Sequence, residues 1–141
     1  MKRIVLLLAA AFVCSVTVFA GEVTPIKVSI FPKLSIPASQ TVHGLDLGLI
    51  ATNVEEVQGL QLNWIYGGID NKLVGAQWGF VNKGNIVTGV QLGFYNGANK
   101  VTGIQLGWIN VTETMEGIQL GLVNVIKKGV VPAMVILNAS F

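Results

Sequence analysis

The stretch from Gly89 to Asn124 decides the fold, because it contains three near-copies of one phrase. The copies read Gly-Val-Gln-Leu-Gly-Phe-Tyr-Asn at 89–96, Gly-Ile-Gln-Leu-Gly-Trp-Ile-Asn at 103–110 and Gly-Ile-Gln-Leu-Gly-Leu-Val-Asn at 117–124. Their leading glycines are 14 residues apart, and a short fixed period is the signature of a repeat architecture. The recurring positions, which we assign a structural role, are Gly89, Gln91, Gly93, Asn96, Gly103, Gln105, Gly107, Asn110, Gly117, Gln119, Gly121 and Asn124.

Weaker copies of the phrase extend the repeat towards the N-terminus. They begin at Gly44, Gly59 and Gly75, so the successive spacings are 15, 16, 14, 14 and 14 residues. The extra residues fall between phrases, as loop insertions do. The first copies also depart from the pattern, since Asp46 replaces the glutamine and Asn63 replaces the second glycine.

Within each phrase the side chains alternate with a period of two. In the 89–96 copy Val90, Leu92 and Phe94 share one face, while the glycines and Gln91 share the other. This alternation is typical of a strand, and a glycine inside a helix costs about 1 kcal/mol. We therefore predict an all-β fold. The segments 83–85 and 96–99 contain Gly and Asn and are predicted turns, with Asn82, Asn96, Asn110 and Asn124 as turn caps.

An antiparallel up-and-down β-barrel of about eight strands is the preferred architecture. The strands would cover about 23–31, 42–51, 57–66, 73–82, 87–96, 101–110, 115–124 and 131–141. Large apolar residues would face lipid, because a soluble surface does not tolerate so continuous an apolar face. The terminal Phe141 also resembles the last residue of outer-membrane barrels.

A β-solenoid with 14-residue coils is the alternative, because near-identical phrases suit coils that each contact a near-identical neighbour. In this version Val90, Leu92 and Phe94 would point into a narrow core. Gln91, Gln105 and Gln119 would then form an outer ladder, and Asn96, Asn110 and Asn124 would form a second ladder at a corner.

The N-terminal segment has the features of a secretory signal. Basic residues Lys2 and Arg3 precede an apolar run, and Ala20 stands before the expected cleavage point. We divide the chain into a signal at 1–20, a lead-in strand and loop at 21–41, the repeats at 42–126 and a C-terminal strand at 127–141. Removing the signal leaves seven lysines against seven acidic residues, so the charge balance gives no reason to expect nucleic-acid binding.

No pattern of catalytic or metal-ligating residues is visible in the sequence. The single histidine, His43, has only Asp46 near it, and Glu55-Glu56 is expected in a solvated turn. We therefore predict a protein that is not an enzyme and has no catalytic, metal or cofactor site.

The phrase at 89–96, 103–110 and 117–124 resembles a family of bacterial surface repeat proteins with a signal peptide and tandem copies of this form. The resemblance covers positions 42–126 and implies export and placement at the outer membrane or cell surface; a periplasmic or secreted location is the alternative. It brings no catalytic residues. Outer-membrane lipid is the expected partner, and the sequence specifies no ligand or protein partner.

Overall fold

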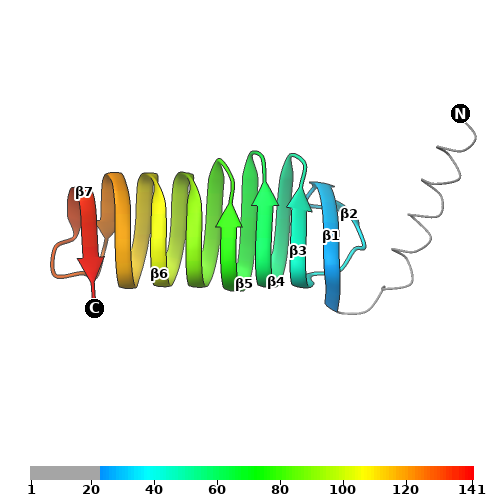
Figure 1. Ribbon diagram of the computed structural model, residues 1–141, viewed down its shortest axis with the longest axis horizontal. Coiled ribbons are helices and arrows are strands. Elements are labelled where there is room, and N and C mark those ends of the chain that lie inside the picture. The colour runs from blue at the N-terminus through cyan, green and yellow to red at the C-terminus, as the bar shows by residue number, and fades with distance from the viewer. Residues whose placement is uncertain (1–22) are drawn as a thin grey trace, which may run out of the picture.

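A computed structural model describes residues 23–141 as seven strands joined in one hydrogen-bonded series (Figure 1). The predicted signal peptide at 1–20 lies outside the described residues. The strands are β1 (Val23–Phe31), β2 (Leu34–Ile36), β3 (Thr41–Gly48), β4 (Ala51–Asn63), β5 (Tyr66–Trp78), β6 (Val81–Ile126) and β7 (Ala133–Ser140). Their order is β2-β1-β3-β4-β5-β6-β7.

Successive repeats pair in parallel, so the chain winds as a β-solenoid. Gly44 lies beside Gly59, Gly59 beside Gly75 and Gly75 beside Gly89, which means that each phrase is in register with the next. The all-β prediction is confirmed, and the alternative architecture is the correct one. The eight-stranded antiparallel barrel is wrong, because the chain returns around a coil after each phrase instead of reversing in a hairpin.

Each coil has a long limb, which carries the start of the phrase, and a short limb on the opposite side. The long limbs are 41–48, 56–63, 72–78, 86–92, 100–106 and 114–120. The short limbs are 51–54, 66–69, 81–84, 95–98, 109–112 and 123–126. The predicted turns at 83–85 and 96–99 are therefore wrong, since both segments belong to strand β6 and pass along short limbs or their ends.

The leading glycine of each phrase is required by its backbone. Six glycines have φ between 135° and 147°, a region that side chains other than glycine rarely adopt: Gly44, Gly59, Gly75, Gly89, Gly103 and Gly117. A Cβ on Gly103 would also collide with the carbonyl oxygen of Gly89 in the preceding coil. The glycine column therefore lets adjacent coils bend at the same place and pack closely.

Antiparallel strands close both ends of the stack. β2 pairs with β1 at the N-terminal end, and β7 pairs with the last coil of β6, placing Asn138 beside Gln119. The predicted C-terminal strand is thus confirmed. The loop predicted within the lead-in at 21–41 contains the short strand β2.

The interior contains one apolar cluster, contributed by both limbs, while the phrase presents its polar side to the core. Nine apolar residues form the buried cluster: Val42, Val54, Val57, Ile69, Leu73, Val87, Val101, Met115 and Ile126. Gln91 is buried between Val90 and Leu92, which are both partly exposed. The orientation predicted for the solenoid is therefore reversed, with glutamine inside and the large apolar side chains outside.

We expect Gly103→Ala to destabilise the protein by about 3 kcal/mol or more, because it combines backbone strain with a collision against Gly89. Urea denaturation followed by tryptophan fluorescence measures this loss. Thr102→Ala, at the neighbouring position of the same limb, is the matched control, since Thr102 is partly exposed and is not among the residues with positive φ. Equal stability of the two variants would contradict the role of the glycine column.

Candidate functional site: a polar core, an apolar face and a polar trough

A ladder of glutamine side chains runs through the interior of the solenoid. Gln61, Gln77, Gln91, Gln105 and Gln119 all have an exposed fraction of zero. Each Nε2 donates to the Oε1 of the glutamine one coil earlier, with distances of 2.6 to 2.8 Å from Gln77 to Gln119. The first member, Gln61, donates to Oδ2 of Asp46 at 2.9 Å. Burying these amides is tolerable because they are paired with one another.

A second amide ladder, formed by the closing asparagines, runs in the opposite direction. Asn82, Asn96 and Asn110 each donate from Nδ2 to the Oδ1 of the asparagine one coil later, at 2.8 to 2.9 Å. The glutamine donors thus point towards the N-terminus and the asparagine donors towards the C-terminus, so the two rows of amide dipoles oppose each other. Asn82, Asn110 and Asn124 also donate to the carbonyl oxygen three residues earlier, at 2.8 to 3.3 Å, so a local capping bond accompanies the ladder. The exposed turn predicted around them is absent, since all four asparagines are completely buried.

The second glycine of each phrase provides space for the asparagine ladder. A Cβ on Gly107 would lie 2.5 Å from Nδ2 of Asn96, and one on Gly121 would lie 2.7 Å from Nδ2 of Asn110. The four recurring positions of the phrase therefore have distinct structural roles. The first glycine lets the coil bend, and the glutamine forms the first ladder. The second glycine leaves room for the asparagine, which forms the second ladder.

The early copies depart from the phrase in a compensating manner. Asn63 stands in the second-glycine position, while Gly67 lies beside Asn82 and so occupies the asparagine column. A Cβ on Gly67 would lie 2.7 Å from Oε1 of Gln61 and would collide with Nδ2 of Asn63. The Asn63 side chain thus fills the space that an asparagine at 67 would take.

Two buried charged residues of opposite sign, Lys27 and Asp46, lie at the N-terminal end of the glutamine ladder without forming a direct ion pair, and the Lys27 ammonium has no hydrogen-bond partner. Lys27 lies beside Asp46 in the parallel register, and both are completely buried. Burial raises the pKa of Asp46 above 3.8, opposed by hydrogen bonds from Gln61 and Thr52 and by the charge of Lys27. Burial also lowers the pKa of Lys27 below 10.5, opposed by the charge of Asp46. Both shifts mark a pair whose desolvation is costly.

We expect Asp46→Asn to lose about 1–3 kcal/mol at pH 7, because the buried Lys27 then loses the opposite charge of Asp46 nearby. The double variant Lys27→Met/Asp46→Asn should recover most of this loss, since the new amide still accepts from Gln61. Chemical denaturation of the three proteins measures the difference. Equal losses in the single and double variants would show that the charge pair is not the cause.

The same pair predicts a dip in stability at intermediate pH. The pKa of Asp46 is higher in the folded protein than in the unfolded chain, so between these two pKa values only the folded protein keeps the proton. The free energy of unfolding therefore falls as pH rises from about 3.8 through the folded pKa. The pKa of Lys27 is lower in the folded protein, so folded Lys27 loses its proton at a lower pH than unfolded Lys27 does. The free energy of unfolding therefore rises again as pH approaches about 10.5. Denaturation midpoints against pH should show the dip in the natural protein. The double variant should lack it, and an identical dip there would contradict this assignment.

The outward positions that follow the first glycine of each phrase form a surface without a charged residue, which we call the apolar face. Three columns of side chains form it, and none of their members is buried: Leu45, Leu60, Ala76, Val90, Ile104 and Ile118; Leu47, Leu62, Trp78, Leu92, Leu106 and Leu120; Leu49, Trp64, Phe80, Phe94, Trp108 and Leu122. In the third column Phe80 stacks on Phe94 with ring centroids 4.9 Å apart, and Phe94 contacts Trp108 at 5.3 Å. The side chains predicted to face lipid in a barrel therefore do face outwards.

The apolar face has a projection near one end and a groove near the other. Trp64 is 71% exposed on the second coil. The groove lies beside Trp108, has a volume of about 540 Å³ and is bordered by Leu120, Leu122 and Ile136. The projection and the groove lie in equivalent parts of the coil, three coils apart along the stack.

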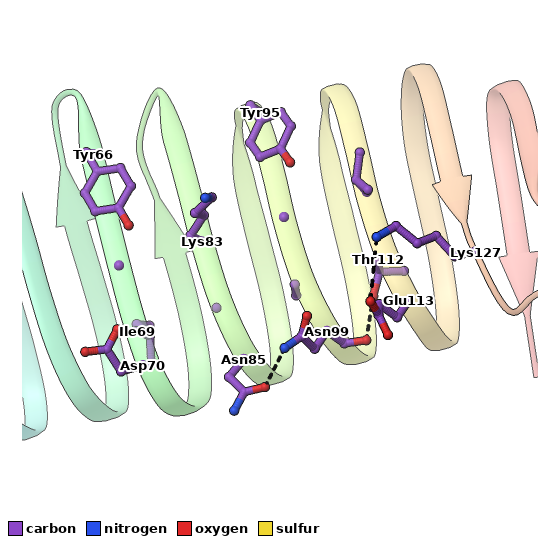
Figure 2. A pocket seen from close by; sticks show the side chains of 15 residues that line it. Tyr66, Ile69, Asp70, Lys83, Asn85, Tyr95, Asn99, Thr112, Glu113 and Lys127 are labelled. Carbon is purple, nitrogen blue, oxygen red and sulfur yellow. Dashed lines mark hydrogen bonds and ion pairs between the residues drawn. The ribbon is translucent and has the colours of Figure 1, made fainter.

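The short limbs carry a different surface, a polar trough of about 460 Å³ (Figure 2). Tyr66 and Tyr95 stand along one side, with Lys83 between them, and Asp70 and Asn99 lie on the other side. These residues come from positions that vary between repeats, so the repeating phrase gave no sign of them. The only sequence signal is that Tyr-x-Gly occurs at 66–68 and again at 95–97.

The other polar residues considered in the sequence are dispersed. His43 is exposed on its long limb, whereas Asp46 points into the core. Glu113 forms ion pairs with Lys127 and Lys128 at 3.6 Å. Across residues 23–141, His, Cys, Asp and Glu side chains form no group of three suited to a metal ion. In the same range no helix is long and apolar enough to cross a membrane.

Comparisons with protein-family models, with curated proteins and with solved structures found no match to this chain.

Proposed function

We propose that this chain is an exported, non-enzymatic β-solenoid of the cell envelope that assembles through its apolar face with a second copy of itself. The observation that carries the proposal is the uncharged apolar face, which lies over the buried amide ladders. Export is supported by the N-terminal sequence, with Lys2 and Arg3 before an apolar run.

The apolar face is large enough for a specific interface. Strand spacing and residue rise give each outward side chain roughly 30 Å² of sheet area, so three columns over six coils cover about 550 Å². Ile26 and Ile30 of β1 and Leu137 of β7 extend the face at its two ends. Two such faces together reach the roughly 1,200 Å² at which specific interfaces begin, whereas monomers rarely expose so much continuous apolar surface.

A second copy fits this face through twofold symmetry. A twofold axis parallel to the strands places the second coil of one copy over the fifth coil of the other. Trp64 of each copy then lies opposite the groove beside Trp108 in its partner. A symmetric dimer needs such self-complementarity, because each contact occurs twice.

The charge distribution favours a second copy over a lipid surface. Interfacial lipid binding gains strength from basic residues beside an apolar face. Here Lys72 and Lys100 lie at one edge of the long limbs together with Glu56, and Glu116 lies close by. The chain has no arginine after Arg3, and its lysines and acidic residues balance after position 20. We therefore treat lipid, the partner expected for a barrel, as the competing occupant.

We expect the protein expressed from the full sequence to sediment as a dimer, and Trp64→Glu to sediment as a monomer. A charge at this position would enter the apolar groove of the partner. Thr88→Glu is the matched control, because Thr88 is exposed on a long limb beyond the three apolar columns, and it should remain dimeric.

Analytical ultracentrifugation without lipid or detergent measures these states. A natural protein that is monomeric at every concentration would contradict self-assembly. If such a monomer also showed a blue shift of tryptophan emission on neutral phospholipid vesicles, lipid would be the occupant instead.

A further inference from the structure

We infer that the polar trough on the short limbs binds an extended, uncharged oligosaccharide lying along the solenoid axis. This site lies on the opposite side of the coils from the apolar face, and its ligand binding goes beyond the proposed assembly. The trough reaches from Tyr66 on the second coil to Lys127 on the last coil, across several strand spacings.

The floor of the trough is low because glycines face outwards beside the tyrosines. A Cβ on Gly68 would lie 2.9 Å from the hydroxyl oxygen of Tyr66, and one on Gly97 would lie 3.1 Å from that of Tyr95. The two rings therefore lean over their glycines, and Figure 2 shows both hydroxyl groups directed towards the trough. Each ring gives a sugar a flat apolar surface with a hydroxyl at its edge.

The opposite rim offers one polar side chain per coil. Asp70, Asn85, Asn99 and Glu113 follow each other along it, and Nδ2 of Asn99 donates to Oδ1 of Asn85 at 2.9 Å (Figure 2). Adjacent strands are about 4.8 Å apart, which is close to the length of one pyranose ring in an extended chain. Successive sugars could thus meet equivalent groups on successive coils.

The balance of charge points to a ligand without net charge. Asp70 and Glu113 supply two carboxylates, while Lys83 and Lys127 supply two ammonium groups, and Lys127 pairs with Glu113 at 3.6 Å. The carboxylates would repel a polyanion, and the lysines would repel a polycation. Hydroxyl groups can donate to the carboxylates and accept from the amides and Lys83.

The trough also disfavours an extended peptide. The short-limb backbones pair with neighbouring coils, so the sheet surface offers no free row of N–H and C=O groups for an added strand. A sugar chain needs no such row, since its hydroxyl groups bind side chains directly.

Tyrosine and tryptophan signals can report separately on the trough and on the apolar face in one experiment. Both tyrosines of the chain line the trough, while Trp64, Trp78 and Trp108 all lie on the apolar face. We would label tyrosine rings and tryptophan indoles and titrate the full chain with cellohexaose, recording NMR spectra. The tyrosine signals should shift and saturate while the indole signals stay unchanged.

Absence of tyrosine shifts up to saturating solubility of cellohexaose would overturn the inference, as would shifts confined to the indoles. Saturation at lower concentration by a neutral Ser/Gly hexapeptide would also overturn it, in favour of a peptide. These results are independent of assembly, because the sedimentation state is measured separately and concerns the other face.

Asn99→Ala should weaken cellohexaose binding by about tenfold, the effect of losing one or two hydrogen bonds. Its side chain is exposed and donates one hydrogen bond to Asn85, which is only partly buried, so the fold should be retained. Thr102→Ala, on the long limbs, is the control and should bind as the natural protein does. Equal affinity of Asn99→Ala and the natural protein would contradict the role of this rim.

Discussion

The hydrogen bond between side-chain amides of successive coils is the interaction on which the structure depends. An amide can both donate and accept, so a row of identical glutamines pairs without end as long as the coils stay in register. A coil shifted by one residue would leave several buried amides unpaired, and each would cost about 1–3 kcal/mol. Register is therefore set by the polar core as strongly as by apolar packing.

The polar core also determines what the surface must be. A strand alternates its side chains, so glutamine and asparagine on the inside place Leu, Phe and Trp on the outside. The long limbs consequently carry the apolar face, while the short limbs, where the sequence varies more, carry the polar trough together with partly exposed valine and isoleucine side chains. Two surfaces of different chemistry on one rigid stack suit a protein that assembles through one side and binds a ligand through the other.

The sequence predicted the all-β class and the repeat period but not the strand bounds or the path of the chain between phrases. Alternation of Val90, Leu92 and Phe94 indicates a strand, yet it is the same for a barrel strand and a solenoid limb. The preference for a barrel arose because the apolar side chains had to face outwards and glutamine was not expected inside a solenoid. Fidelity of the Gln91, Gln105 and Gln119 positions was the signal for parallel stacking, since only identical neighbours complete the ladder.

The candidate surfaces were predictable to different degrees. The apolar face follows from the phrase itself, because its members recur in every copy. The trough depends on Gly68, Gly97 and two tyrosines at variable positions, and only the coil geometry shows that they lie on one side. Likewise, the pairing of Lys27 with Asp46 requires the register of β1, which the lead-in sequence does not reveal.

Hydrogen exchange of the glutamine side-chain amides tests the central claim most directly. In a polar-core solenoid, the Nε2 protons of Gln77, Gln91 and Gln105 are buried and bonded, so they should exchange far more slowly than those of Gln58, which is exposed. NMR of the natural protein resolves both groups in one spectrum. Exchange of the three ladder amides at the rate of Gln58 would contradict a buried glutamine ladder and the fold built on it.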